Sequence, residues 1–254
     1  MLKKRIIPIQ LLLDGRLVKT VRFDGWRDVG DPVKSAAVYN SQYADELIFL
    51  NISRERRSVA DLQKVIAEVS KVSFMPMAMG GGIGSAEDAA FLILNGADKV
   101  VVNSIAYDRK EVISRTADTF GAQAVIVCID VRFDEERGDY VLYSDCGRRA
   151  EHVGLEEHVE AVIAAGAGEV MIQSIDRDGT MKGFDIAATK RVMAVSSAPV
   201  IAAGGSGNYD QMKDCFLETD VSALACGSLF NFSDSNPIRA KAFLSNYGLN
   251  FKKV

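Results

Sequence analysis

The chain has 254 residues, of which 48% are hydrophobic, and this length suits one domain with a full buried core. A net charge of -4 and a pI near 5.4 argue against nucleic-acid binding, which normally requires a clustered basic face. No segment is apolar over enough residues to cross a membrane, and we expect a cytoplasmic protein.

Short runs rich in Ile, Val and Ala alternate with longer segments of helical period, which is typical of a parallel sheet buried on both faces. The first run, Ile6 to Leu13, leads directly into Asp14-Gly15-Arg16 and lacks a cleavage site, so it predicts a strand rather than a signal peptide. Strands are predicted near 5–13, 46–52, 74–79, 99–103, 124–130, 168–174, 199–203 and 222–227. Helices are predicted near 31–43, 58–71, 86–96, 107–119, 155–165, 185–195, 208–218 and 236–246. The pattern predicts an α/β fold, a single (β/α)8 TIM barrel spanning residues 1–254.

Three helix starts carry N-terminal signals: Asp31-Pro32, Ser85-Ala86-Glu87 and Asn208-Tyr209-Asp210. Two βα loops exceed the usual length, Asp14 to Gly30 and Val131 to Gly154. Long loops at the carboxyl ends of barrel strands commonly form lids and substrate contacts. Trp26 lies in the first of them and is interpreted as loop or core packing.

A glycine-rich turn follows a short apolar run once in each half of the chain. The two turns are Gly80-Gly81-Gly82-Ile83-Gly84-Ser85 and Ala203-Gly204-Gly205-Ser206-Gly207-Asn208. Glycine lets backbone N–H groups approach an anion closely, and the next helix N-terminus adds a positive dipole end. The pattern predicts two phosphate sites, one in each half.

The similarity between the halves extends to the preceding strands. Residues 45–54 match residues 168–177 at the same offset that places Gly81-Gly82 on Gly204-Gly205. A duplicated half of four strands, with halves of about 1–122 and 123–254, explains this match. The alternative is that βα loops in general resemble one another.

Three aspartates are predicted at the catalytic mouth. Asp130 ends an apolar strand, and Asp176 and Asp178 follow the sixth strand toward the same rim. Such carboxylates can exchange protons with a substrate held between two phosphate anchors. The alternative is that Asp178-Gly179 is a turn and Asp176 pairs with Arg177.

The histidines and cysteines do not suggest a further reactive centre. His152 and His158 have no matching nucleophile nearby and are expected on the surface. Cys128, Cys146, Cys215 and Cys226 show no metal-binding spacing and are predicted to be reduced core or loop thiols. We therefore expect neither a metal ion nor another cofactor.

Four charged residues open strands at the opposite end of the barrel. They are Arg5, Glu46, Lys99 and Glu169. Two bases and two acids can close that end as a ring of ion pairs, and charge on this face normally concerns stability. A partner protein below the ring would make it a gate.

Motifs along almost the whole chain resemble the cyclase subunit of imidazole glycerol phosphate synthase. They are Arg5-Ile6-Ile7, Asp14-Gly15-Arg16 with Val18-Lys19, Gly30-Asp31-Pro32, Asp45-Glu46-Leu47, Gly80-Gly81-Gly82-Ile83, Gly96-Ala97-Asp98-Lys99-Val100, Ile129-Asp130, Ser174-Ile175-Asp176-Arg177-Asp178-Gly179 and Gly204-Gly205. The resemblance implies a barrel of two half-barrels that binds a small molecule with a phosphate at each end. It also implies a glutaminase subunit docked on the amino-terminal face, which sends ammonia through the barrel.

The resemblance assigns roles to individual residues. Asp130 and Asp176 match active-site acids, and Lys19 lies on a mobile first loop. One phosphate site is Gly82, Asn103 and Ser104, and the other receives Asp178, Gly179, Gly205, Gly227 and Ser228. Arg5, Glu46, Lys99 and Glu169 match an ammonia gate, and Asp98 matches a residue that faces the glutaminase.

One departure from the family affects the chemistry. Where the family has another essential aspartate, in a sequence like cysteine-leucine-aspartate, this chain has Ile9-Gln10-Leu11. Leucine cannot transfer a proton, and losing a positioned acid or base typically costs about 10²- to 10⁴-fold in rate. Asn51 likewise replaces a usual aspartate.

These losses favour a divergent copy that resembles proteins encoded with surface-glycan genes. There, a glutaminase and a cyclase-like barrel supply ammonia to a third, ATP-dependent enzyme that converts a sugar N-acetyl group to an acetamidino group. The residues of both phosphate sites are present, which argues against a pure conduit. The alternatives are a true imidazole glycerol phosphate synthase in which another acid, such as Asp14, substitutes, and a scaffold that only activates its glutaminase.

Overall fold

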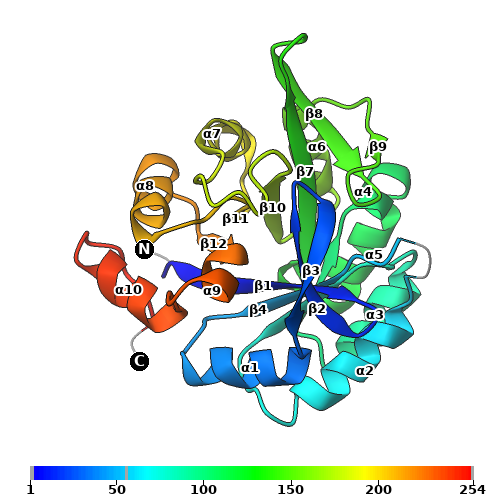
Figure 1. The fold of residues 1–254 in the computed structure, drawn as a ribbon. Coiled ribbons are helices and arrows are strands. Elements are labelled where there is room, and N and C mark those ends of the chain that lie inside the picture. Colours follow the sequence, from blue (N-terminus) through cyan, green and yellow to red (C-terminus); the bar gives the residue numbers. More distant parts are fainter. Residues whose placement is uncertain (1–2, 55–56, 253–254) are drawn as a thin grey trace.

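The computed structural model describes residues 3–54 and 57–252. Its centre is a closed barrel of parallel strands, in which the last strand pairs back onto the first (Figure 1). In order around the barrel the strands are β1 (Arg5–Leu13), β4 (Leu47–Asn51), β5 (Met77–Gly80), β6 (Lys99–Val102), β7 (Val125–Asp134), β10 (Glu169–Ser174), β11 (Val200–Ala203) and β12 (Ala223–Cys226). The predicted TIM barrel is confirmed.

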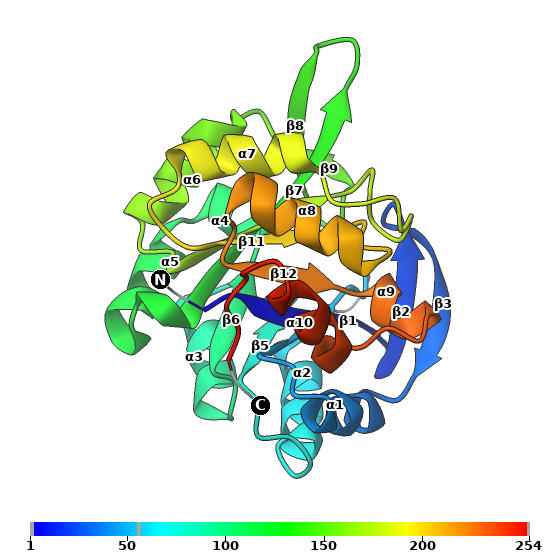
Figure 2. The ribbon, with the colours of Figure 1, turned by 90° about the vertical axis from the view of Figure 1, so that its left-hand side faces the viewer.

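Helices connect the strands and surround the barrel (Figures 1 and 2). They are α1 (Pro32–Ser41), α2 (Val59–Val69), α3 (Ala86–Leu94), α4 (Ser104–Asp108), α5 (Glu111–Phe120), α6 (Leu155–Ala164), α7 (Ile186–Val195), α8 (Tyr209–Thr219), α9 (Ser228–Phe232) and α10 (Pro237–Ser245), with a 3-10 turn at Ala122–Ala124. Within the described ranges, no helix combines the length and the apolar character needed to span a membrane.

The predicted helix starts are confirmed by their hydrogen bonds. The Asp31 carboxylate accepts from the backbone N–H groups of residues 33 and 34, and Pro32 takes the first helical position, where an N–H is not needed. Ser85 Oγ accepts from Asp88 N at 3.1 Å, and Asn208 Oδ1 accepts from residue 211 in the same way.

Two predicted elements differ in the structure. The helix expected near 107–119 is two helices, because Arg109 leaves the helical region with φ -143° and ends α4. The strand expected near 74–79 begins only at Met77 and leaves Phe74 89% exposed. Pro76 precedes the strand and has no N–H to donate to a neighbouring strand.

The two long loops contain β-hairpins that extend the sheet. After β1, the antiparallel strands β2 (Arg16–Val21) and β3 (Asp24–Gly30) fold across the carboxyl end of the barrel. After the barrel part of β7, the strand continues to Asp134 and pairs with β8 (Asp139–Ser144), followed by the short β9 (Arg149–Ala150). The β7–β8 hairpin projects away from the body of the molecule (Figures 1 and 2).

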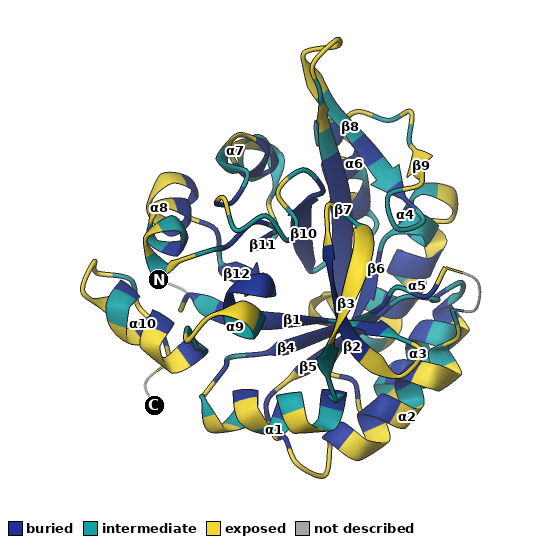
Figure 3. Cartoon of the chain, in the orientation of Figure 1, coloured by how far each residue is buried: buried dark blue, intermediate teal, exposed yellow. Residues whose placement is uncertain are grey.

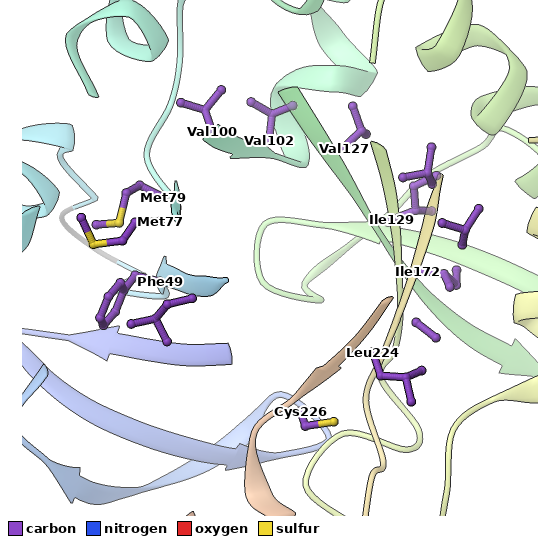
Figure 4. Packing of buried hydrophobic residues seen from close by; sticks show 14 of the residues in the cluster. Phe49, Met77, Met79, Val100, Val102, Val127, Ile129, Ile172, Leu224 and Cys226 are labelled. Atoms are coloured by element: carbon purple, nitrogen blue, oxygen red, sulfur yellow. The ribbon is translucent and has the colours of Figure 1, made fainter. Parts of the chain in front are cut away.

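Alternation along the strands creates two apolar layers. One layer packs between strands and helices and includes Phe49, Met79 and Ile129 (Figure 4). The other fills the barrel interior with side chains from every barrel strand, among them Ile7, Ile48, Ala78, Val101, Ile126, Met171, Ile201 and Ala223. Burial follows this arrangement, with exposed residues on the outer helix faces, on β3 and at the β7–β8 tip (Figure 3).

Candidate functional site

A cavity of about 900 Å³ lies at the carboxyl ends of the barrel strands, below the β2–β3 hairpin. Most of the residues predicted for the site line it: Leu11, Lys19, Asn51, Gly82, Asn103, Ser104, Asp130, Asp178, Gly179, Gly205, Gly227 and Ser228. The structure therefore brings together residues from both halves of the sequence at the end of the barrel where such enzymes place their sites.

Asp130 is a buried acid without a cationic partner among the contacts of the described residues. Its Oδ2 accepts a hydrogen bond from Asn103 Nδ2 at 2.9 Å, and its Oδ1 accepts from the Cys128 thiol at 3.4 Å. Burial raises the pKa of Asp130 to about 7, and the nearby Asp178 carboxylate acts in the same direction. A group that titrates near neutral pH can both accept and donate a proton.

Asp178 is the second acid of the pocket and is half-buried. Its Oδ2 accepts from Thr20 Oγ1 at 2.8 Å and from Phe23 N at 3.4 Å. Burial raises the pKa of Asp178, although the Thr20 hydrogen bond and the Lys19 charge oppose the shift. The carboxylate therefore holds the β2–β3 hairpin onto the loop after β10.

Asp176 is not among the residues that line the cavity. Its Oδ2 accepts from Phe133 N at 2.9 Å, and its Oδ1 lies 3.5 Å from Arg132 Nε. The alternative pairing with Arg177 is not formed either, because the Arg177 side chain donates to Lys182 O. Of the two aspartates after β10, it is Asp178 that lines the pocket together with Asp130.

Lys19 lies on β2 with its side chain buried in the pocket. Its Nζ donates to Ile9 O at 2.7 Å, and burial lowers the pKa of Lys19 to about 8. A Cβ built on Gly227 would lie 2.2 Å from this Nζ, so the ammonium sits directly at the start of α9. Lys19 is therefore the cation at the second predicted phosphate site.

Residues of two other loops pack beside the first glycine turn. Gly81 and Gly82 have φ of 94° and 82°, and a Cβ on Gly82 would lie 3.0 Å from the Arg57 backbone. The Arg57 guanidinium pairs with Asp145, whose backbone N–H donates to Ser104 Oγ at 3.0 Å. An arginine that the sequence analysis missed therefore lies beside this site.

The second glycine turn has the same backbone conformation. Gly204 and Gly205 have φ of 87° and 100°, and a Cβ on Gly205 would lie 2.2 Å from Gly183 O. Ser206 is buried beside them, and its hydroxyl has no hydrogen-bond partner among the described residues. Close backbone approach requires glycine here whether or not a ligand binds.

The two departures from the family pattern also face the pocket. Leu11 shares the inward face of β1 with Ile9, and both line the cavity. Asn51 is buried, and its Oδ1 accepts from Ser53 N at 3.0 Å. The nearest alternative acid, Asp14, lines the cavity from the exposed turn between β1 and β2.

At the opposite end, the four predicted charges form a closed ring. Arg5 pairs with Glu46 and Glu169, and Lys99 pairs with the same two carboxylates, with Nζ 3.0 Å from Glu46 Oε1. Burial raises the pKa of Glu169, but Arg5 and Lys99 outweigh it and hold this pKa below its usual range. Every member of the ring thus has a counter-charge on each side.

Around this ring, the amino-terminal face exposes several apolar side chains. Tyr43, Phe74 and Leu94 are exposed on the segments that lead into β4, β5 and β6. Asp98 is exposed at the same end, where its Oδ2 accepts from Met77 N at 2.8 Å.

One surface prediction is wrong. His158 is 1% exposed and stacks on Tyr107 with the ring centroids 4.0 Å apart. It lies on the face of α6 that packs against the barrel, a position that its helical spacing from Leu155 and Val162 indicates. His152 is exposed as expected, and the four cysteines are free thiols.

The fold and the cavity define a (β/α)8-barrel protein with a small-molecule pocket at the carboxyl ends of its strands. The model of the histidine biosynthesis protein family matches residues 5–235, and the chain belongs to this family.

Three relatives share the name "Imidazole glycerol phosphate synthase subunit HisF". The Staphylococcus carnosus protein is 38% identical over 252 residues, which cover 99% of each chain. The Halalkalibacterium halodurans protein is 39% identical over 249 residues, covering 98% of this chain and 99% of its own. The Chlorobaculum parvum protein is 40% identical over 252 residues, covering 98% of each.

Proposed function

We propose that the chain is the synthase subunit of a glutamine-dependent amidotransferase of the HisF type, which receives ammonia at the ring and uses or passes it on at the pocket. The observation that carries this proposal is the arrangement of the two ends. A ring of paired charges closes one end, a pocket with a near-neutral acid occupies the other, and they share one barrel axis.

The barrel interior between the ends supports passage of neutral ammonia. Apolar side chains such as Ile7, Ile48 and Val101 fill most of the inner layer, and Cys128 and Gln173 lie toward its pocket end. A neutral molecule crosses such a lining at far lower cost than ammonium, whose charge would lose its hydration. Because the ring is closed, one of its ion pairs must break before a molecule can enter the barrel.

The amino-terminal face supports a protein partner. Phe74 is 89% exposed beside the ring, and Leu94 and Tyr43 extend the apolar surface. Apolar side chains gathered on one face are typical of interaction sites. We propose that this partner is a glutaminase, which docks on the amino-terminal face and releases ammonia at the ring. The ring residues are Arg5, Glu46, Lys99 and Glu169.

The first candidate reaction is the formation of imidazole glycerol phosphate, the activity that the relatives' name states. Two glycine turns, with Arg57 beside one and Lys19 beside the other, fit a substrate that has a phosphate at each end. Asp130 and Asp178 would exchange protons with that substrate, since both line the pocket and their pKa values are raised.

One observation favours a second candidate. Leu11 faces the pocket where proton transfer to the substrate from β1 would require an acid, and Asn51 is held in a local turn. A barrel that has lost cyclisation can still deliver ammonia. The second candidate is ammonia supply to a separate ATP-dependent enzyme that converts a sugar N-acetyl group to an acetamidino group.

Turnover of the histidine-pathway ribonucleotide with saturating ammonium salt separates these candidates, because the salt removes the need for a glutaminase. Sustained turnover by the natural chain supports the first candidate. No turnover by the natural chain, with turnover gained by Leu11→Asp, supports the second. Absence of turnover and of ribonucleotide binding in both proteins would overturn the proposed phosphate-binding pocket.

A histidine auxotroph that lacks only its cyclase subunit gives the matching test in cells. Growth at the normal rate with the natural chain supports the first candidate. Lys99→Ala then distinguishes a conduit from a scaffold, because unchanged glutamine-dependent growth would show that ammonia does not pass through the ring.

A further inference from the structure

Three residues near Asp130 hold buried polar atoms that have no hydrogen-bond partner among the described residues. The atoms are Asn103 Oδ1, Tyr107 Oη and both ring nitrogens of His158. Buried polar atoms in native proteins almost always bond to another protein group or to an ordered water. The proposed reaction uses none of these atoms.

Contacts and helical spacing join the three residues in a line that starts at Asp130. Asn103 Nδ2 donates to Asp130 Oδ2 at 2.9 Å, from the position that immediately precedes α4. Tyr107 follows Asn103 by four residues on α4, a spacing that brings two side chains to the same side of a helix. The Tyr107 ring stacks on His158 of α6, with the centroids 4.0 Å apart and the planes 3° from parallel. The line therefore runs from β7 through α4 to α6.

The Asn103 side chain is not used as a helix cap. Asparagine before a helix normally accepts from one of the first backbone N–H groups, but Asn103 makes no such bond. Its NH2 group meets the Asp130 carboxylate, and its Oδ1 is buried away from solvent. Rotating the amide by half a turn would place an acceptor against the carboxylate. The donating orientation of Asn103 thus depends on what its Oδ1 meets.

Tyr107 presents a protonated hydroxyl at this place. Burial raises the pKa of Tyr107 far above its ordinary value. The other groups whose charges act on it are Asp130, Cys128 and Glu151, which raise the pKa further, and Arg149, which opposes them. The hydroxyl therefore remains a hydrogen-bond donor at neutral pH. This donor and the Asn103 acceptor are one helical turn apart and are not bonded to each other, so one buried water can satisfy both.

His158 fixes the Tyr107 ring by packing and not by charge. Burial lowers the pKa of His158 to about 4, and Lys110 acts in the same direction. The imidazole is therefore neutral in the pH range where Asp130 titrates. A parallel contact between two buried rings restricts the tyrosine, so its hydroxyl keeps one position.

We infer that Tyr107 is a positioning residue for Asp130: through a buried water it holds the Asn103 amide with its NH2 group toward the carboxylate, and His158 holds Tyr107 in place. This inference rests on the proposed function, which makes Asp130 the reacting acid. It adds two residues outside the pocket lining to the groups that set the protonation of that acid.

The test measures the pH midpoint of Asp130 by carbon NMR of its side-chain carboxyl group, in the protein without substrate. Losing a donor destabilises the carboxylate and raises its midpoint. We expect a rise of about 1 pH unit in Asn103→Ala and of about 0.5 pH unit in Tyr107→Phe. Asp178, the other acid whose charge acts on Asp130, is unchanged in both variants.

A double variant and two controls show whether Tyr107 acts through Asn103. Adding Tyr107→Phe to Asn103→Ala should produce no further rise, because the amide that Tyr107 holds is already gone. His158→Phe should leave the midpoint unchanged, since a ring still packs on Tyr107. Tyr39→Phe is the matched control: it removes the hydroxyl of another buried tyrosine, on α1, and should also leave the midpoint unchanged.

Two results of the titration would overturn the inference. One is an unchanged midpoint in Tyr107→Phe, and the other is a further rise in the double variant, which would mean that Tyr107 acts on Asp130 without Asn103. A high-resolution crystal structure of the natural chain should show an ordered water bonded to Asn103 Oδ1 and Tyr107 Oη, and a site without that water would also contradict the inference.

Failure of the proposed function gives a different result. Because the titrations contain no substrate, they do not depend on any reaction. The expected midpoints together with no turnover of the ribonucleotide and no delivery of ammonia would refute the proposed function and support the role of Tyr107.

Discussion

Glu169 and Asp130 are buried carboxylates on the neighbouring strands β10 and β7, 6% and 7% exposed, yet their pKa values move in opposite directions. Glu169 lies at the start of its strand between Arg5 and Lys99, which hold its pKa low despite burial. Asp130 lies near the carboxyl end of the barrel, where Asn103 and Cys128 are its only donors within the described part of the chain, and burial raises its pKa to about 7.

The difference shows how one barrel separates stability from chemistry. At the ring end, each buried charge is paired, and removing one residue of the ring would take a counter-charge from both of its partners. At the pocket end, Asp130 has no counter-charge among the described residues, which costs stability but leaves its proton exchangeable near neutral pH. Three predictions test this contrast and a fourth concerns a buried group at neither end; they run from the largest expected effect to the smallest.

Asp130→Asn should slow the ammonium-driven reaction by about 10²- to 10⁴-fold, because the amide cannot transfer a proton. Asp176→Asn is the matched control, since Asp176 lies outside the cavity lining and bonds to the β7–β8 hairpin. Steady-state rates of the two variants decide the assignment. Equal losses from both would show that Asp176 also acts at the reaction centre.

Glu169→Ala should lower the free energy of unfolding by about 3–5 kcal/mol, because Arg5 and Lys99 would each lose a buried counter-charge. Urea denaturation measures the loss. A change below about 1 kcal/mol would mean that the ring relaxes into solvent and that its charges are not paired as described.

His158 lies at neither end of the barrel. Its pKa shows the effect of burial on a group that has no nearby acid to stabilise its charged form. Burial lowers its pKa from 6.5 to about 4, with Lys110 acting in the same direction. The unfolded chain therefore binds a proton that the folded chain does not between pH 6.5 and 4, and stability should fall by up to about 3 kcal/mol as the pH decreases through this window.

Urea titrations at several pH values between 4 and 7 test this, with His158→Phe as the comparison because phenylalanine can keep the stacking on Tyr107. The variant should lose the His158 part of the pH dependence. An unchanged slope in His158→Phe would assign the acid sensitivity to other groups.

Asp145→Ala should change the free energy of unfolding by less than about 1 kcal/mol, although it removes an ion pair with Arg57 at the pocket. Both side chains reach solvent at the cavity mouth, so the freed guanidinium can be hydrated. Set beside Glu169→Ala in the same urea experiment, a loss as large as that of the ring variant would remove the contrast between the two ends.

The strands and most helices could be predicted from the sequence because their signals are local. Continuous apolar runs marked the barrel strands, and Asp31, Ser85 and Asn208 marked helix starts through their own hydrogen bonds. The hairpins inside the two long loops were not predicted. Strand β3 is exposed along most of its length, so it lacks the alternation of a half-buried strand.

The residues of the candidate site could be predicted where a strand sets the direction of the side chain, and they could not where a turn sets it. Asp130 faces the axis because it continues the alternation of β7, and Leu11 does the same on β1. After β10 the chain turns, and periodicity no longer tells whether Asp176 or Asp178 points inward. Contacts between segments distant in sequence, such as Thr20 with Asp178 and Asp145 with Arg57, set the positions of these other pocket side chains. The duplication of the two halves stays a prediction.

The most direct test of this account is a pH titration of Asp130 and Glu169 by carbon NMR of their side-chain carboxyl groups, with Asp130→Asn and Glu169→Gln used to assign the signals. The account predicts a midpoint near 7 for Asp130 and a midpoint below 4.5 for Glu169. An Asp130 midpoint near its ordinary value of 3.8 would contradict it, because Asp130 would then be ionised throughout the neutral range and could not donate a proton there.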